Sequence, residues 1–155
     1  MTEKTLTKIC VIGAGAIGGF FGVRLAQGFA DVSVVARGVA LQAIQSRGWV
    51  LEHAGVRQVA TVRAVADTSQ LGVQDVVVIA VKAYALAEIL PLVRPLLGSH
   101  TVVVPALNGV PWWFTLDDGD NLASTDPTGA IAAAIPAHQI LGAVVYPACS
   151  SPEPG

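Results

Sequence analysis

Apolar residues in this chain gather in short runs separated by stretches of helical character. Four runs are rich in valine and mostly lack polar alternation, as expected of strands buried on both faces of a sheet. They are residues 9–12, 32–36, 76–81 and 101–104. The helices predicted between them are residues 16–27, 40–46 and 83–97. Pro91 and Pro95 should make the second half of the last helix irregular.

Two further parts of the pattern add to this alternation. Residues 49–53 and 56–65 alternate around Ala54-Gly55 and predict a small antiparallel β insertion. Residues 140–146 predict a last strand, and residues 117–128 are polar and rich in turn formers. The fold class is therefore α/β, a Rossmann-like, doubly wound and mostly parallel sheet, forming one domain over residues 1–155.

The first strand runs directly into a glycine motif of the form G-x-G-x-x-G. Its residues are Gly13, Ala14, Gly15, Ala16, Ile17 and Gly18. Gly13 would permit a tight turn, Gly15 would leave no Cβ facing a pyrophosphate, and Gly18 would let the helix lie close to the strand. The amides and positive dipole of the helix start would then face phosphates. A glycine turn that binds nothing is the weaker alternative, because a strand and a helix flank the motif.

The end of the second strand bears on the choice of dinucleotide. In this fold an acidic residue at that position usually holds the ribose 2′-hydroxyl of NAD. Here the strand ends in Ala36-Arg37-Gly38, so a guanidinium stands where it could grip a 2′-phosphate. We interpret Arg37 as a sign of NADP preference; a solvated arginine is the alternative.

Two polar residues follow the other buried strands. Lys82 comes directly after residues 76–81, and Asn108-Gly109 follows residues 101–104. Ligands of open α/β sheets bind beyond the carboxyl ends of the strands, so both residues should lie at the edge that carries the glycine turn. Taken singly, a solvated lysine and an ordinary Asn-Gly turn are equally good explanations.

Other candidate residues receive no role in the site. The aromatic run 112–114 could stack on a ligand, but such clusters more often pack, and we expect this one to pack against a missing partner. His53, His100 and His138 lack metal-ligand spacing, so no metal is expected.

Composition limits the function classes. The hydrophobic fraction is 53% and the charged fraction 13%, an apolar excess that we attribute to an interface. A net charge of −2 with nine basic residues gives no sign of nucleic-acid binding. Pro136, His138 and Gln139 interrupt the best late apolar stretch, which argues against a membrane span.

The cysteines and the N-terminus bear on the compartment. Cys10 and Cys149 have neither zinc spacing nor a C-x-x-C arrangement, and both should be small buried residues in a reducing compartment. A secretory signal is disfavoured by Glu3 in the would-be basic region and by five glycines between residues 13 and 22. We therefore expect a cytoplasmic protein.

Taken together, these motifs resemble the N-terminal half of the ketopantoate reductases, also called 2-dehydropantoate 2-reductases. The resemblance covers nearly the whole chain. It rests on residues 9–18, Ala36-Arg37, Val81-Lys82-Ala83, Leu107-Asn108-Gly109-Val110 and residues 142–148. Pro111-Trp112-Trp113 resembles a subset of the family.

The resemblance implies NADPH-dependent reduction of 2-dehydropantoate, a keto acid, to (R)-pantoate, a step towards pantothenate and coenzyme A. By matching position, residues 13–18 would bind the pyrophosphate and Arg37 the 2′-phosphate of NADP(H). Lys82, Asn108 and Ala148 would bind the nicotinamide end, and Asn108 would also face the substrate. Such a reaction requires a fixed hydride donor and a proton donor.

The sequence departs from the family in length. The lysine that donates the proton, and most substrate ligands, belong to a C-terminal helical domain that we expect to lie beyond Gly155. We therefore name no catalytic residue, and expect this part alone to turn over negligibly; the parent protein could be a homodimer. Opine, 3-hydroxyacid and glycerol-phosphate dehydrogenases share this cofactor half and remain alternatives, as does a non-catalytic nucleotide-binding module.

Overall fold

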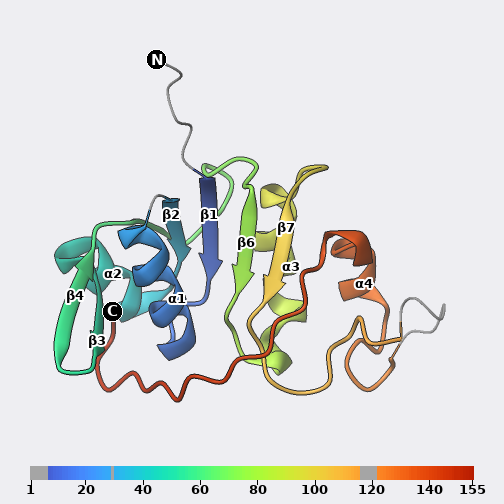
Figure 1. Cartoon of the computed structure of the whole chain (residues 1–155). Coiled ribbons are helices and arrows are strands. Elements are labelled where there is room, and N and C mark those ends of the chain that lie inside the picture. Colours follow the sequence, from blue (N-terminus) through green and yellow to red (C-terminus); the bar gives the residue numbers. More distant parts are fainter. Residues whose placement is uncertain (1–6, 29, 116–121) are drawn as a thin grey trace.

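Five parallel strands form the central sheet of the computed structural model, which describes residues 7–28, 30–115 and 122–155 (Figure 1). Across the sheet the order is β5-β2-β1-β6-β7. The strands are β1 (Thr7–Ile12), β2 (Ala30–Val35), β5 (Arg63–Val65), β6 (Val76–Ile79) and β7 (Val102–Pro105). Ile12 at the end of β1 is in register with Val35 of β2 and Ile79 of β6, so these carboxyl ends are level at one edge. The predicted Rossmann-like fold is confirmed.

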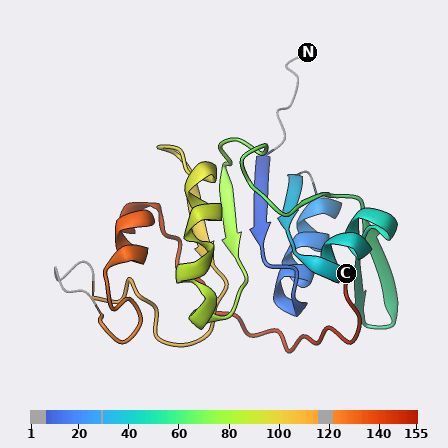
Figure 2. The same ribbon diagram turned by 180° about the vertical axis from the view of Figure 1, so that it is seen from behind.

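Each face of the sheet has its own apolar core. Helix α1 (Ala16–Gln27) covers one face, where Val11, Val23 and Trp49 are buried. Residues 83–97 cover the other face, seen in Figure 2, where Val77 and Leu96 are buried. Burial on both faces explains why the central strands read as continuous apolar runs.

Glycines form the buried face of α1. The helix buries Gly18, Gly19, Gly22 and Val23. A Cβ on Gly22 would lie 2.0 Å from Cζ3 of Trp49, so the helix approaches the indole more closely than any other residue would allow.

The antiparallel insertion differs from its prediction in one respect. Strand β3 (Trp49–His53) pairs with β4 (Val56–Ala60) as expected. Residues 56–65 are not one strand, however, because β5 leaves the hairpin and joins the edge of the main sheet, parallel to β2. Ala60 of β4 and Ala64 of β5 are both buried in the same apolar core as Val23 and Trp49.

Residues 83–97 do not form the single helix that was predicted. They comprise the 3₁₀ turns η1 (Ala83–Ala85), η2 (Ala87–Ile89) and η3 (Arg94–Leu96) and one short helix, α3 (Leu90–Val93). Pro91 and Pro95 have no N–H to donate to the carbonyls four residues earlier, so each removes a hydrogen bond that a continuous α-helix would make. The irregularity extends into the first half, further than expected. Helix α2 (Gly38–Arg47) matches its prediction.

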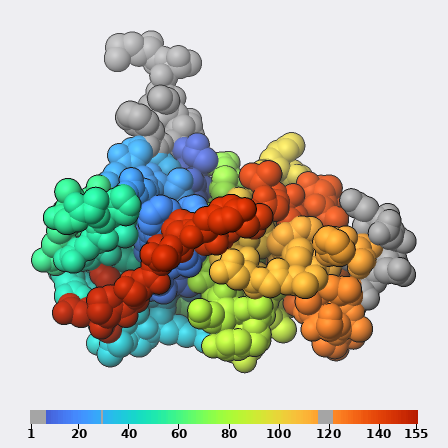
Figure 3. All heavy atoms as spheres, turned by 60° about the horizontal axis from the view of Figure 1, so that its bottom comes forward, coloured from blue at the N-terminus to red at the C-terminus, as the bar shows by residue number. Residues whose placement is uncertain are grey.

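The last predicted strand, at residues 140–146, is wrong. A single bridge joins Ile140 to Val103 of β7, and the N–H of Leu141 donates to the carbonyl of Val103 (2.8 Å). Beyond that point residues 141–155 form no helix or strand and lie across the carboxyl edge of the sheet (Figure 3). Before it, α4 (Ala130–Ala134) and η5 (Ala137–Gln139) were not predicted. Of the polar segment 117–128, residues 117–121 lie outside the described residues.

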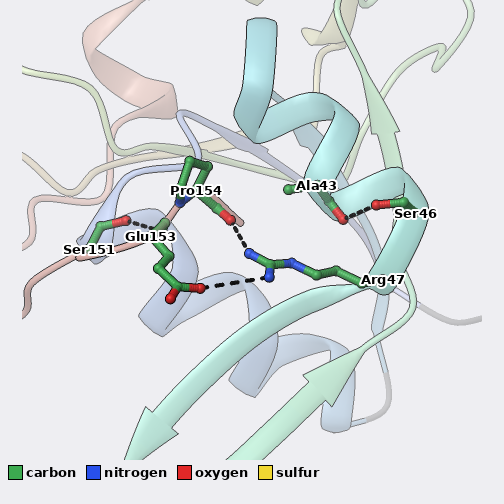
Figure 4. Close-up of polar contacts among 6 residues, drawn as sticks. All are labelled: Ala43, Ser46, Arg47, Ser151, Glu153 and Pro154. Carbon is green, nitrogen blue, oxygen red and sulfur yellow. Dashed lines mark hydrogen bonds and ion pairs between the residues drawn. The ribbon is translucent and has the colours of Figure 1, made fainter.

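The end of this crossing segment is held against α2 and β3. The guanidinium of Arg47 donates to the carbonyl of Pro154 and lies 3.7 Å from a carboxylate oxygen of Glu153 (Figure 4). The N–H of Val50 donates to the carbonyl of Gly155 (3.1 Å). Within the described part of the chain, no helix is long and apolar enough to span a membrane.

Candidate cofactor site

The glycine turn lies at the carboxyl end of β1 and needs glycine at its first position. Gly13 has φ +107°, and its N–H donates to the carbonyl of Val35 (3.1 Å). A Cβ at this position would lie 2.7 Å from the carbonyl oxygen of Ala80, which follows β6. The turn is thus wedged between the ends of the two neighbouring strands.

The other two glycines of the motif differ in their surroundings. A Cβ on Gly18 would lie 1.9 Å from the carbonyl oxygen of Gly13, so glycine lets the helix start close against the turn. Gly15, the N-cap of α1, would have no atom within 4 Å of its Cβ. The protein itself therefore does not require glycine at Gly15, and the space beside it is open to an approaching ligand. The amides of Ala16, Ile17 and Gly18 begin the helix there, beside Ala14.

Two clefts meet at Ala14 and Gly15. One, of about 350 Å³, extends between the ends of β1 and β2 and the segment after β6. Among the described residues, the only polar side chains that line it belong to Arg37 and Glu88. The other, of about 510 Å³, lies between the start of α1, strand β3 and the crossing segment.

Arg37 lies where the sequence placed it, at the carboxyl end of β2, from which only Ala36 separates it. Its backbone is extended (φ −131°, ψ 160°) at the N-cap of α2, and its side chain is exposed in the smaller cleft. Within the described part of the chain it has no ion pair, since that part contains one such pair, Arg47 with Glu153. The guanidinium is therefore available to an anion that enters the cleft.

The three remaining predicted residues are exposed at the same edge. Lys82 precedes η1, and Asn108 follows β7. Ala148 belongs to the segment that crosses this edge. Neither cleft is lined by any of the three. The structure thus gathers the predicted residues at one edge but assembles only the glycine turn and Arg37 into a common cleft.

Glu88 is a cleft residue that the sequence reasoning missed. It belongs to η2, next to the buried Ile89. The sequence does contain a signal for it, because an acidic residue occurs in the segment that follows a buried strand of this fold. The continuous helix expected there left the orientation of this side chain undetermined.

The aromatic run packs differently from its prediction. Trp112 is 1% exposed, lies in the core beside α4, and meets Trp113 edge to face with ring centroids 4.5 Å apart. Trp112 therefore fills this chain's own core rather than an interface with a missing partner. Phe114 is 71% exposed.

Both cysteines are free thiols, and the described part of the chain shows no metal site. Burial raises the pKa of Cys10 to about 11, partly offset by Ser33, so this thiol is not a nucleophile at neutral pH. Cys149 is half-buried rather than buried as predicted. Among the described residues no group of three His, Cys, Asp or Glu side chains could hold a metal ion.

The parallel sheet with its level strand ends, and the glycine turn at the carboxyl end of β1, define a Rossmann-like α/β fold. Residues 9–155 match the sequence model of one family, described as ketopantoate reductase PanE/ApbA. The chain belongs to that family.

Individual relatives agree with this assignment. The chain is 46% identical over 154 residues to a 2-dehydropantoate 2-reductase of Mesorhizobium japonicum, covering 96% of this chain and 47% of that protein. A crystal structure from Ralstonia solanacearum, provisionally described as a ketopantoate reductase, is 46% identical with a TM-score of 0.92, over 97% of this chain and 48% of that one. The chain thus spans about half the length of these relatives.

A more distant structure contains a bound cofactor. D-mandelate dehydrogenase in a ternary complex with NADH and anilino(oxo)acetate is 25% identical to this chain, with a TM-score of 0.67, over 86% of this chain and 39% of that one.

Proposed function

We propose that this chain is the cofactor-binding part of an NADPH-dependent reductase that converts 2-dehydropantoate to (R)-pantoate, on the way to pantothenate and coenzyme A. Family membership supports the reaction. The observation that carries the choice of cofactor is the position of Arg37, which lies between β2 and α2 and shares a cleft with the glycine turn. A guanidinium there suits the 2′-phosphate that distinguishes NADPH from NADH.

The residues present fit this cofactor. The amides of Ala16, Ile17 and Gly18 and the dipole of α1 would bind the pyrophosphate, and Gly15 leaves room for it. Arg37 would hold the 2′-phosphate. The cofactor, when bound, supplies a hydride to the ketone carbon.

The reacting end of the site is less complete. Lys82, Asn108 and Ala148 would orient the nicotinamide, with Asn108 towards the keto acid. We assign no proton donor among these residues, and propose that the donor and most substrate ligands belong to a C-terminal helical domain of the longer protein. This chain by itself would turn over negligibly.

The proposal also covers the cellular compartment and the binding partners of the enzyme. Cys10 and Cys149 are free thiols, which supports a reducing compartment, and we place the enzyme in the cytoplasm. Its partners are the small keto acid and the C-terminal domain; a homodimer of the whole protein is open to test by sedimentation.

Calorimetric titration of the chain with NADPH and NADH tests the choice of cofactor. We expect NADPH to bind more tightly, and Arg37→Ala to remove about 1 to 3 kcal/mol of that preference, as for a lost charged hydrogen-bond partner. Arg94→Ala is the matched control, because Arg94 is exposed in η3 and lines neither cleft. Circular dichroism verifies that each variant folds. Equal affinity for both nucleotides, unchanged in Arg37→Ala, would contradict the NADP assignment.

A second candidate is an NADH-dependent 2-hydroxyacid dehydrogenase. Its support is the similarity to D-mandelate dehydrogenase with NADH, together with Glu88, which brings a carboxylate into the cleft of Arg37. It predicts the opposite order of affinities in the same titration, with NADH bound more tightly than NADPH. Assays of the full-length protein with 2-dehydropantoate and with aromatic keto acids would then identify the substrate.

A further inference from the structure

The smaller cleft contains one charged side chain that the proposed binding of phosphates does not use. Arg37 and Glu88 both line it, and they do not form an ion pair, since the described residues contain only the pair of Arg47 with Glu153. The rest of the lining is backbone of the glycine turn and small or apolar side chains, among them Val81 and Leu92. Among the described residues that line the cleft, Glu88 is therefore the one anionic side chain.

The two charged residues reach the cleft from opposite sides of β1. Arg37 follows β2 and Glu88 belongs to the segment after β6, and these strands flank β1. The segment with Glu88 lies on the face of the sheet seen in Figure 2. A ligand that joins the two sides must pass the glycine turn, which lies between them.

An adenosine phosphate has three parts to be held in such a cleft. The turn and α1 suit the pyrophosphate, and Arg37 suits the ribose phosphate. The third part is a flat base, whose faces suit apolar walls and whose edge needs hydrogen-bond partners. Glu88 is the only polar side chain of the lining left for that edge.

We propose that Glu88 is a specificity residue for the base of the cofactor, its carboxylate accepting a hydrogen bond from the exocyclic amino group of adenine. The inference rests on the proposed binding of NADPH. An ionised carboxylate can only accept hydrogen bonds, so it favours a base with an amino group at this edge and disfavours one with a carbonyl. Hypoxanthine differs from adenine in that exchange.

The experiment compares NADPH with its deamino form, in which hypoxanthine replaces adenine. Both are titrated into the folded 155-residue chain and into Glu88→Ala, Glu88→Gln and Asp31→Ala. Asp31 is exposed at the start of β2, at the opposite edge of the sheet, and controls for the loss of one negative charge. The readout is the ratio of the two dissociation constants, because a general change in repulsion between cofactor and protein affects both equally.

We expect the unmodified chain to prefer NADPH by about tenfold, as for one hydrogen bond to a charged group. Glu88→Ala should bring the ratio close to one, and Asp31→Ala should leave it unchanged. In Glu88→Gln the amide can also donate, so the deamino form should gain affinity while NADPH is retained.

Three outcomes in a chain that binds NADPH would overturn the inference. Equal affinity for NADPH and the deamino form would show that no group of the protein recognises the exocyclic amino group of adenine. A preference that survives in Glu88→Ala would assign the reading to another group. A loss of affinity for NADH but not for NADPH in Glu88→Ala, measured by a parallel titration with NADH and with the base ratio unchanged, would show that Glu88 holds the ribose hydroxyl. If no nicotinamide dinucleotide binds at all, the proposed function fails and this inference with it.

Discussion

Arg37 and Glu88 show how far single residues can be assigned from sequence. Arg37 was predicted because it directly follows a strand whose end is fixed by its apolar run. Glu88 lies nine residues beyond the end of β6, in a segment whose broken helical geometry decides which side chains face the cleft. A residue adjacent to a strand can therefore be placed from the pattern alone, whereas one in a 3₁₀ turn requires coordinates.

Cys10 makes a prediction about pH. Its pKa is about 11 in the folded chain against 9.0 for an ordinary thiol, because the folded protein buries it. The folded state thus holds the proton over a pH range in which the unfolded state has lost it. The stability due to the neutral thiol is fully present below pH 9 and falls by about 1.4 kcal/mol per pH unit as the pH rises to 11.

Urea unfolding of the chain and of Cys10→Ala between pH 7 and 11 measures this effect. The alanine variant should be less stable at pH 7, since it leaves a small cavity, and the gap should narrow above pH 9. A gap that stays constant to pH 11 would show that Cys10 is not buried as described. Cys149→Ala is the control, because the pKa of Cys10 does not depend on it.

At the scale of elements, the start of α1 has glycine for two different reasons, close packing at Gly18 and space for a ligand at Gly15. Single substitutions can separate these two roles. Gly18→Ala brings a Cβ to 1.9 Å from the carbonyl oxygen of Gly13, so we expect a loss of about 1 to 3 kcal/mol in the free energy of unfolding, or more. Gly15→Ala meets no atom within 4 Å and should cost less than about 1 kcal/mol. Its methyl group enters the space proposed for the pyrophosphate, so NADPH affinity should fall at least tenfold.

Gly19→Ala is the control for a methyl group elsewhere in this helix, since its Cβ would meet Trp49 at an ordinary 3.5 Å. It should change neither stability nor binding by as much. Thermal unfolding and calorimetry on the three variants separate the two roles. Full NADPH affinity in a folded Gly15→Ala variant would remove the glycine turn from the proposed site.

The elements that the sequence did not predict depend on long-range contacts. β5 is three residues long and is a strand only because β2 offers its edge there. Residues 140–146 have the composition of a strand but make one bridge to β7, so composition did not decide their structure. The buried strands and α1, by contrast, are specified by their own residues, and these elements carry the glycine turn and Arg37.

At the scale of the whole molecule, large apolar side chains are exposed at the edge that carries the site. Tyr84 and Tyr146 are 86% and 88% exposed. Leu141 and Val144, which are near Tyr146 in the sequence, are also exposed. Single exposed apolar residues are ordinary, but several on the elements of one functional edge are typical of an interface. The relatives are about twice as long as this chain, and we propose that their second half covers this edge.

This proposal predicts that the 155-residue chain self-associates. Replacing Tyr84 and Tyr146 together by serine should shift the chain towards monomer in sedimentation and lower its fluorescence with a hydrophobic dye, while the midpoint of urea unfolding stays unchanged because neither side chain is buried. Val39→Ser with Val56→Ser is the matched pair, since both valines are exposed on α2 and β4. If the matched double variant has the same effect, self-association is a general result of the apolar composition. If the unmodified chain is monomeric and binds no dye, the edge does not need to be covered by a second domain. The result would then favour a stand-alone nucleotide-binding module.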